Sequence, residues 1–380
     1  MGNVVLYKWD DTGAPQLSYA AGSALALFDA CLVNGYGSKA GAGWTKSFTD
    51  STNKRTVYKQ GGTTGRHFFQ VYDNSEGFFS WAGYETMTDT VTGTNCFVGG
   101  NTHSTSHWGT GTTVTTTSTC RHLKSNYSGY NAKWYLIADD RTFYFFVRDE
   151  RDPYFCSYMP MMFGDIYSML PGDLYKCAGI GGYVQRADQT VGGFWISHFA
   201  NFDDSGATDW ITGHSTSTYV VTGNNNLVYW SGSSGSAALP NRLQAISRSY
   251  DGVTQSMFIT KGWSNLGLRN GITTPPPKMG GQSSNLRYPD PVSGRLILSP
   301  VYINEKNLIN RGFLRGLYAP CHFMPIPGEA NIITGAGNMA GKEFLSLPVQ
   351  ASYSWNAGNT SASYPGQVFI ETTSGWQTSQ

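Results

Sequence analysis

The sequence predicts a mainly β protein built from antiparallel hairpins and sandwich-like sheets, with one short buried N-terminal helix and long loops. Charged residues make up only 13% of the chain while Gly reaches 46, a composition typical of β-rich proteins with many turns. Short apolar runs recur between Gly- and Asp-containing turns, which is the pattern of strands and hairpins. Only one segment has the apolar periodicity of a helix, so little helix is expected.

The helix is expected at residues 23–34. Ser23 is expected to cap its first turn, because the hydroxyl can accept a bond from a free backbone N–H. Gly35 is expected to end it, because Gly adopts a positive φ without strain. The apolar face has the helical spacing i, i+3 and i+7 at Leu25, Phe28 and Leu32, and is widened by Leu27, Cys31 and Val33. The helix is therefore predicted to be buried on most sides beneath a β structure.

The first clear β element is a meander. Residues 56–60 and 66–73 are two strands joined by the Gly-rich loop 61–65, and residues 78–85 form a third strand. The second clear element is a hairpin around the turn 139–141. Its strands are nearly continuous in apolar residues, which predicts that both of their faces are covered.

The other strands follow less distinct patterns. The chain is expected to be irregular from residue 153 until a strand begins at residue 174. The remaining expected strands lie at 4–9, 133–138 and 142–148 (the hairpin above), 174–185, 193–199, 218–222, 227–230, 243–250, 256–261, 296–303, 313–319, 343–349 and 367–373.

Two lobes are expected along the chain. An N-terminal β lobe, residues 1–155, contains the helix and an excursion at 86–119 that is dominated by Thr, Ser and Gly. A C-terminal β lobe, residues 156–380, contains an irregular Pro-rich arm at 262–295, which excludes helix and central strand. One continuous domain is the alternative.

The composition limits the kinds of partner that we expect. A net charge of +1 gives no reason to expect nucleic-acid binding, and no apolar run is long enough for a membrane span. Residues 1–10 lack the apolar core of a targeting segment, so synthesis in the cytoplasm is expected. The six cysteines are widely spaced, which favours reduced, buried thiols over disulfides.

The excursion and its flank contain candidate zinc ligands. His103 and His107 have an acceptable spacing, but Cys96 and Cys120 do not have the spacing of any compact zinc module. The sequence therefore predicts no metal site, with polar loop histidines and buried thiols as the preferred interpretation.

Cofactor binding is not expected either. The run GAGNMAG at 335–341 imitates a dinucleotide fingerprint, but that chemistry needs a long helix after the glycines. Here KEFLSLP follows, with the pattern of a strand. Lys342 is followed by Glu343, so the run is not a phosphate-binding loop.

No catalytic set is expected, and the protein is predicted not to be an enzyme. The close carboxylate groups are Asp139-Asp140, Asp203-Asp204, and Asp149-Glu150 with Asp152. Adjacent residues on a strand point to opposite faces, and Asp is a preferred turn residue, so turn formation is the preferred interpretation. Most tryptophans lie in expected strands, which favours core and interface positions over a carbohydrate platform for Trp81, Trp108, Trp195, Trp210, Trp230 and Trp263.

Several stretches resemble a family of tailed-bacteriophage virion structural proteins. The first is APQLSYAAGSALALFDACLVNGYGSKAGAGWTKSF at 14–48, followed by MMFGDIYSMLPGDLYKCAGIGG at 161–182. The others are RGFLRGLYAPCHF at 311–323 and, near the C-terminus, AGKEFLSLP and GQVFIETTSGW. The shared positions are structural ones (Gly, Pro and aromatic residues), and no catalytic residues come with the resemblance.

The resemblance implies a structural protein of the virion. We expect this subunit to assemble in multiple copies, at the tail or baseplate rather than as a capsid decoration. Other virion proteins and further copies of the chain are the expected partners, through the arm 262–295 or the excursion 86–119. The alternative is a receptor- or glycan-binding phage protein that uses loops 86–119 and 201–238, with a host surface glycan as its partner.

Overall fold

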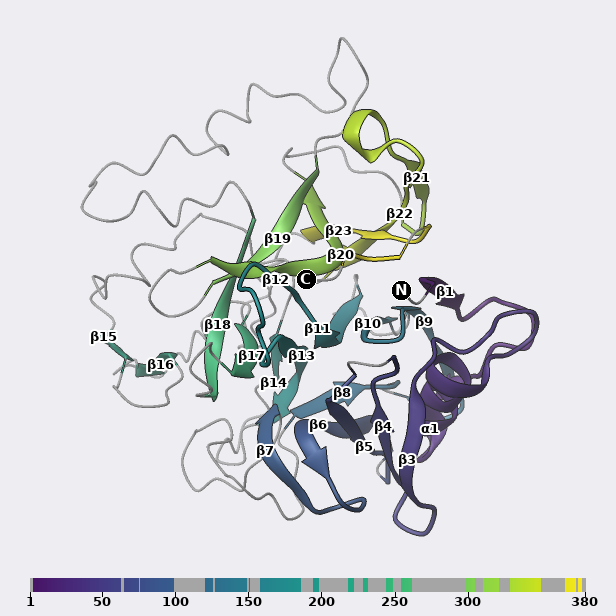
Figure 1. Cartoon of the computed structure of the whole chain (residues 1–380). Helices are drawn as coiled ribbons and strands as arrows, with labels where there is room; N and C mark the ends of the chain where they lie inside the picture. Colours follow the sequence, from purple (N-terminus) through teal and green to yellow (C-terminus); the bar gives the residue numbers. More distant parts are fainter. Residues whose placement is uncertain are drawn as a thin grey trace.

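The computed structural model confirms a mainly β, antiparallel protein with one short helix, and strands make up 51% of the residues that it describes. The described residues are 3–62, 65–74, 76–98, 120–125, 127–148, 150, 158–185, 194–197, 218–221, 228–231, 244–248, 254–261, 298–304, 310–320, 329–349, 366–373 and 375–377. Helix α1 (Ser23–Phe28) and the strands that follow it lie together at one end of the molecule, and the last strands lie at the other (Figure 1).

The N-terminal meander is present and longer than predicted. It runs through β3 (Thr45–Asp50), β4 (Arg55–Lys59), β5 (Phe68–Tyr72), β6 (Phe78–Met87) and β7 (Gly93–Val98), each paired with the next. Strand β8 (Cys120–Leu123) pairs with the first residues of β6, on the edge opposite β5, and also pairs with β13. The sequence missed β3 because TKSFTD is polar and largely exposed, without the apolar alternation that marks a half-buried strand.

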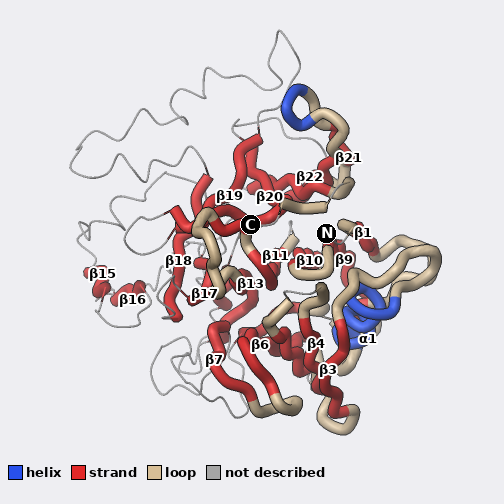
Figure 2. The backbone as a smooth tube through the Cα atoms, in the orientation of Figure 1, coloured by secondary structure: helices blue, strands red, loops and turns tan. Residues whose placement is uncertain are grey.

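Three neighbouring strands form the centre of the molecule. Strands β9 (Asn131–Ala138) and β10 (Thr142–Arg148) make the expected hairpin, and β11 (Met159–Asp165) pairs with the far side of β10. Figure 2 shows these strands near the middle of the molecule, close to both chain ends. β11 corrects the expectation of an irregular segment from 153 to 174. Its Met- and Pro-containing sequence has modest strand propensity, and complete burial rather than propensity stabilises it.

The central strands are buried on both faces, as the continuous apolar pattern of the hairpin predicted. Alternate side chains enter two separate cores, because successive residues of a strand point to opposite sides. Trp134, Leu136, Phe143, Phe145, Met161 and Phe163 belong to the core beneath the meander and helix. Tyr135, Ile137, Tyr144, Phe146 and Met162 belong to the second core, with side chains from the C-terminal strands.

A ring of paired strands, called the barrel below, closes on itself and contributes side chains to the second core. From β11 the pairing passes through β13 (Cys177–Gln185), β17 (Gln244–Arg248), β18 (Thr254–Lys261), β19 (Leu298–Asn304) and β20 (Asn310–Pro320). It closes because β12 (Tyr167–Ser168), directly after β11, pairs with β20. The lobe boundary expected at residue 155 falls between β10 and β11, and these two strands are hydrogen-bonded neighbours.

Smaller elements extend these sheets. β1 (Val5–Lys8) and β2 (Leu17–Ser18) pair with β9, and β14 (Phe194–Ser197) pairs with β13. β23 (Gly366–Glu371) pairs with β20 and with β22 (Glu343–Val349), which pairs with β21 (Ile332–Thr334). β15 (Thr218–Val221) and β16 (Val228–Ser231) form a separate two-stranded sheet. Among the described residues, no helix has the length and apolar character to cross a membrane.

The helix begins and ends where expected. It runs as α1 (Ser23–Phe28) and continues as a π-helix, Asp29–Asn34, which ends at Gly35 with a φ of 80°. Phe28 is fully buried and contacts aromatic rings from both the meander and β10, at Tyr58, Phe69, Phe79, Phe143 and Phe145. The helix thus joins the meander to the central strands.

The expected Ser23 cap is wrong. Gly22 precedes the helix with a φ of 92°, and the Ser23 hydroxyl donates to the carbonyl of Ser18 at 2.8 Å. Asp73, directly after β5, supplies the cap instead: its Oδ2 accepts the Ala24 N–H at 2.8 Å. Its Oδ1 pairs with Lys124 at 2.5 Å, and both of these side chains are 0% exposed. A residue far away in the sequence therefore replaces the local cap.

Asp73→Ala is expected to lower the unfolding free energy by about 3–5 kcal/mol, because it leaves the buried Lys124 ammonium without its counter-charge. Ser23→Ala should cost only about 1 kcal/mol, the value of one hydrogen bond. Urea unfolding of both variants measures the difference, and equal losses would show that Asp73 is not the cap.

Leu32→Ala is expected to cost about 2–5 kcal/mol, since Leu32 is fully buried and its truncation leaves a cavity. Leu25→Ala on the same helix is the matched control, with a smaller loss because Leu25 is only half-buried. Both are measured by thermal and urea unfolding, and a wild-type unfolding temperature for Leu32→Ala would refute the packing described here.

Several expectations fall outside the described residues. They include the excursion from residue 99 to 119, loop 201–238 apart from the backbone of β15 and β16, and the arm 262–295 with its prolines. The proposed roles of these segments in assembly or glycan binding therefore stay predictions.

Candidate functional site

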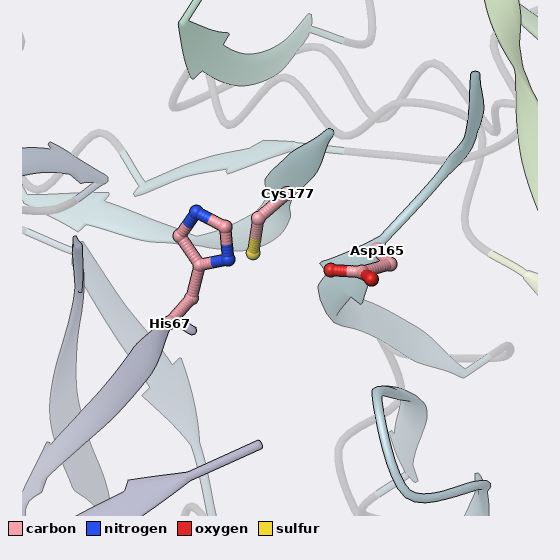
Figure 3. Close-up of side chains that lie close together, drawn as sticks. All are labelled: His67, Asp165 and Cys177. Carbon is pink, nitrogen blue, oxygen red and sulfur yellow. The ribbon is translucent and has the colours of Figure 1, made fainter. Parts of the chain in front are cut away.

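A buried polar cluster lies where the meander meets the barrel. It consists of Gln60 directly after β4, His67 directly before β5, Asp165 at the end of β11 and Cys177 at the start of β13 (Figure 3 shows the last three). One potential ligand atom from each of His67, Asp165 and Cys177 lies within 4.8 Å of the others. The three residues are only 2–5% exposed, so the cluster is enclosed rather than set in an open cleft.

Strand pairing brings these residues together. Asp165 and Cys177 are direct partners in the β11–β13 ladder, and the Gln60 N–H donates to the His67 carbonyl at 3.1 Å. Gly61 allows the β4–β5 end to approach the centre, because a Cβ there would lie 2.1 Å from the Gly43 carbonyl oxygen. Its N–H donates to Asp140 O at 2.7 Å, which fixes the hairpin end against the β9–β10 turn.

The Gln60 amide connects the cluster. Its Nε2 donates to Arg141 O at 2.7 Å and to Asp165 Oδ1 at 2.9 Å, and lies 4.0 Å from Cys177 Sγ. Its Oε1 accepts the His67 backbone N–H at 3.0 Å and lies 3.2 Å from Nδ1 of the same ring. Because the carbonyl of Arg141 requires a donor and the N–H of His67 an acceptor, the orientation of the amide is fixed.

Burial controls the charges in the cluster. It raises the pKa of Asp165 to about 6, against the opposing effects of the Gln60 hydrogen bond and the charge of Arg315. Burial, together with the nearby Asp165 carboxylate, also raises the pKa of the Cys177 thiol well above its usual value. Such a group of nitrogen, oxygen and sulfur donors, enclosed in protein, is suited to holding a cation.

A second buried network joins the β9–β10 turn to the C-terminal segment. Arg315 on β20 donates to Asp139 Oδ2 at 2.5 Å and to Thr142 Oγ1 at 2.9 Å. It also donates to the carbonyls of Trp376 at 3.2 Å and Gln377 at 2.7 Å. Burial raises the pKa of Asp139, while the Arg315 charge opposes that rise. Thr142 Oγ1 donates to Asp165 O at 2.8 Å, so this network reaches the His67 cluster.

A third buried pair anchors the turn after β12. Arg311 donates from Nε to Asp173 Oδ2 at 2.7 Å and from Nη2 to Asp173 Oδ1 at 2.6 Å. The two side chains are 0% and 2% exposed. Burial alone would raise the pKa of Asp173, but hydrogen bonds from Arg311 and Ser168 and the Arg311 charge hold it below its ordinary value.

The residues weighed for zinc are only partly described. Cys96 on β7 and Cys120 on β8 pair with Tyr84 and Trp81 of β6 in the strand ladders, and nothing beyond their backbone positions is described. His103 and His107 lie outside the described residues.

The candidate catalytic carboxylates that the structure describes have structural roles. Asp139 forms the expected turn, since its Oδ1 accepts the N–H groups of Arg141 and Thr142 at 2.9 and 2.8 Å. Glu150 pairs with Lys133 near the surface, at 2.6 Å. Asp149, Asp152 and the pair 203–204 lie outside the described residues.

The glycines at 335–341 belong to the connection between β21 and β22, with a short 3-10 helix at Gly337–Met339. The expected strand follows them as β22, in place of the long helix that a dinucleotide site requires. Trp81 is fully buried in the core, as expected. Of the other five tryptophans, the side chains are not described.

No sequence pattern predicts the His67 cluster. Its members are separated by long stretches of chain, and none belongs to a spaced ligand motif. Only the β4–β5 hairpin and the β11–β13 register bring them together, and β11 itself was not predicted.

No protein-family model matches the chain, and no curated protein matches it. The structure therefore defines the class, a mainly β protein with a barrel and an appended meander sharing central strands. Its function has to be inferred from the residues and their geometry.

Asp173→Asn is expected to lower the unfolding free energy at pH 7 by about 1.5–3 kcal/mol, the worth of hydrogen bonds to a charged group. The folded pKa of Asp173 is below the unfolded one, so its contribution is present above about pH 4 and is lost as the pH falls through the folded value. Unfolding at neutral and acid pH should show the two proteins converging in acid. Asp10→Asn, at a surface pair with Lys8, is the control and should change little at either pH.

Proposed function

We propose that this chain is a structural subunit of a tailed-phage virion, located at the tail or baseplate and acting by assembly in multiple copies. The proposal rests on the resemblance of the stretches quoted above, which span nearly the whole sequence. The proposed role is that of a scaffold without catalytic activity.

The position of the resembling stretches in the fold supports this proposal. Residues 14–48 supply the buried helix, 161–182 supply β11 and the start of β13, and 311–323 supply β20. The last stretch supplies β23 and Trp376, which packs against Tyr144 at a centroid distance of 5.3 Å. Arg315 contacts residues of the central turn and of the C-terminal segment. The resembling residues thus meet in one buried framework, which is what a family defined by a rigid assembly scaffold would share.

The turn at 169–174 is a suitable contact for a neighbouring subunit. It belongs to a resembling stretch, and it exposes Met169 at 47% and Leu174 at 54%. The Arg311–Asp173 pair and the bond from Met169 N–H to Arg311 O, at 2.8 Å, hold the turn in place. A contact that is already ordered loses less entropy on binding.

Locating the subunit in purified particles tests the proposed function. Quantitative mass spectrometry should find it in many copies, and cryo-electron microscopy should place it in the tail or baseplate. A chain present in infected cells but missing from purified particles would refute the proposal. Specific signals on a glycan array, lost on deletion of 86–119 or 201–238, would instead favour the receptor-binding alternative.

Met169→Ser combined with Leu174→Ser is expected to reduce incorporation into particles while leaving folding intact, because both side chains are already exposed. Ile332→Ser is the matched control, since Ile332 is also 47% exposed but lies outside the resembling stretches. Complementation with each variant, followed by particle purification, measures incorporation. Equal incorporation of both variants would exclude the turn as a contact.

A further inference from the structure

We propose that His67, Asp165 and Cys177 bind a structural zinc ion that links the meander to the barrel. This departs from the sequence expectation of no metal, which considered only the cysteines and histidines of the excursion. The proposal goes beyond the virion role and does not depend on it.

The donor set favours zinc over other common cations. An imidazole nitrogen, a thiolate and a carboxylate oxygen are the ligand types of zinc sites, whereas calcium and magnesium prefer oxygen alone. A thiolate among the ligands also favours a borderline-soft ion. Metal coordination would resolve the electrostatic cost of the cluster, because a divalent cation compensates the buried carboxylate and keeps the buried thiol deprotonated.

The geometry is close to that of a bound site. Figure 3 shows a ring nitrogen of His67 directed toward Cys177 and Asp165, with the Cys177 sulfur between the ring and the carboxylate. Tetrahedral zinc with bonds of about 2.0–2.3 Å places its ligand atoms roughly 3.3–3.8 Å apart. The observed separations of at most 4.8 Å need only small side-chain rotations to close around an ion.

Gln60 completes the arrangement. Its Oε1 is held by the His67 N–H and lies 3.2 Å from Nδ1 of that ring, a separation suited to two ligands of one metal ion. Its Nε2 donates to Asp165 Oδ1, an outer hydrogen bond of the kind that orients a ligating carboxylate. The geometry therefore assigns Gln60 as the fourth ligand through its carbonyl oxygen, and His67 as a ligand that gives up its Nδ1 proton.

The effect of the ion would be a cross-link between elements far apart in the chain. His67 belongs to the meander, while Asp165 and Cys177 belong to β11 and β13 of the barrel. A ligand that binds the folded state and not the unfolded chain stabilises the fold, by an amount that grows with the logarithm of its concentration over its dissociation constant. Removing zinc should therefore lower the unfolding temperature of the whole protein.

The test starts with the full-length protein purified from zinc-supplemented medium. Elemental analysis should find one zinc per chain, and chelation with EDTA should lower the unfolding temperature, with recovery on adding zinc back. Cobalt substituted for zinc in the wild-type chain should give a thiolate-to-cobalt charge-transfer band. A protein without bound zinc, or bound cobalt without that band, would overturn the proposal without requiring any variant to fold.

Variants then identify the site. Cys177→Ser and His67→Gln should lose the metal. Gln60→Ala, which removes the proposed fourth ligand, should weaken binding by at least the roughly 10–100-fold that loss of an outer supporting residue costs. Cys31→Ser, at a buried thiol outside the cluster, is the matched control and should retain zinc. Retention of zinc by Cys177→Ser with its loss in His103→Ala would place the metal in the excursion and refute this assignment.

Discussion

Strands β9, β10 and β11 have no face toward solvent, and the rest of the structure depends on this constraint. Apart from Asn131, Lys133 and Arg148 at the strand ends, their residues are buried. The apolar side chains alternate between two cores, so both cores must be built around these strands. The helix and meander cover one face, and the barrel strands cover the other. Burial of aromatic side chains on both sides supplies the driving force, since apolar area removed from water is worth about 25 cal/mol per Å². The two lobes expected from the sequence therefore meet along strands β9, β10 and β11.

The buried ion pairs lie where separate segments of the chain meet, and not inside the two apolar cores. Lys124–Asp73 connects the end of β8 to the end of β5 beside the helix N-terminus, and Arg315–Asp139 connects the central turn to β20. Arg311–Asp173 fixes the turn after β12. Such pairs add little net stability compared with apolar replacements, because both partners lose their hydration. Their geometry instead fixes the relative positions of segments that distant parts of the sequence supply.

Elements with a strong local pattern could be predicted from the sequence. The helix, its end at Gly35, the meander and the β9–β10 hairpin all follow from periodicity and turn residues. β3 was missed because its residues are polar and exposed, and β11 because tertiary burial overrides its weak propensity. The Ser23 cap failed for the same reason: Asp73, brought near by β5, competes successfully for the same N–H groups. The His67 cluster depends on register between unpredicted neighbours, so no spacing rule could find it.

The two-faced burial of β10 also limits how the sequence can evolve. A one-residue insertion there would shift the pleat and send every following side chain to the opposite core. Substitutions at neighbouring positions face different packing partners, so compensating changes must come from different parts of the chain. Length variation is consequently confined to exposed turns outside the strands, such as that at Gly129, where an added Cβ meets nothing within 4 Å. Relatives of this protein should therefore keep the length of β10 fixed while their surface turns differ freely in length and composition.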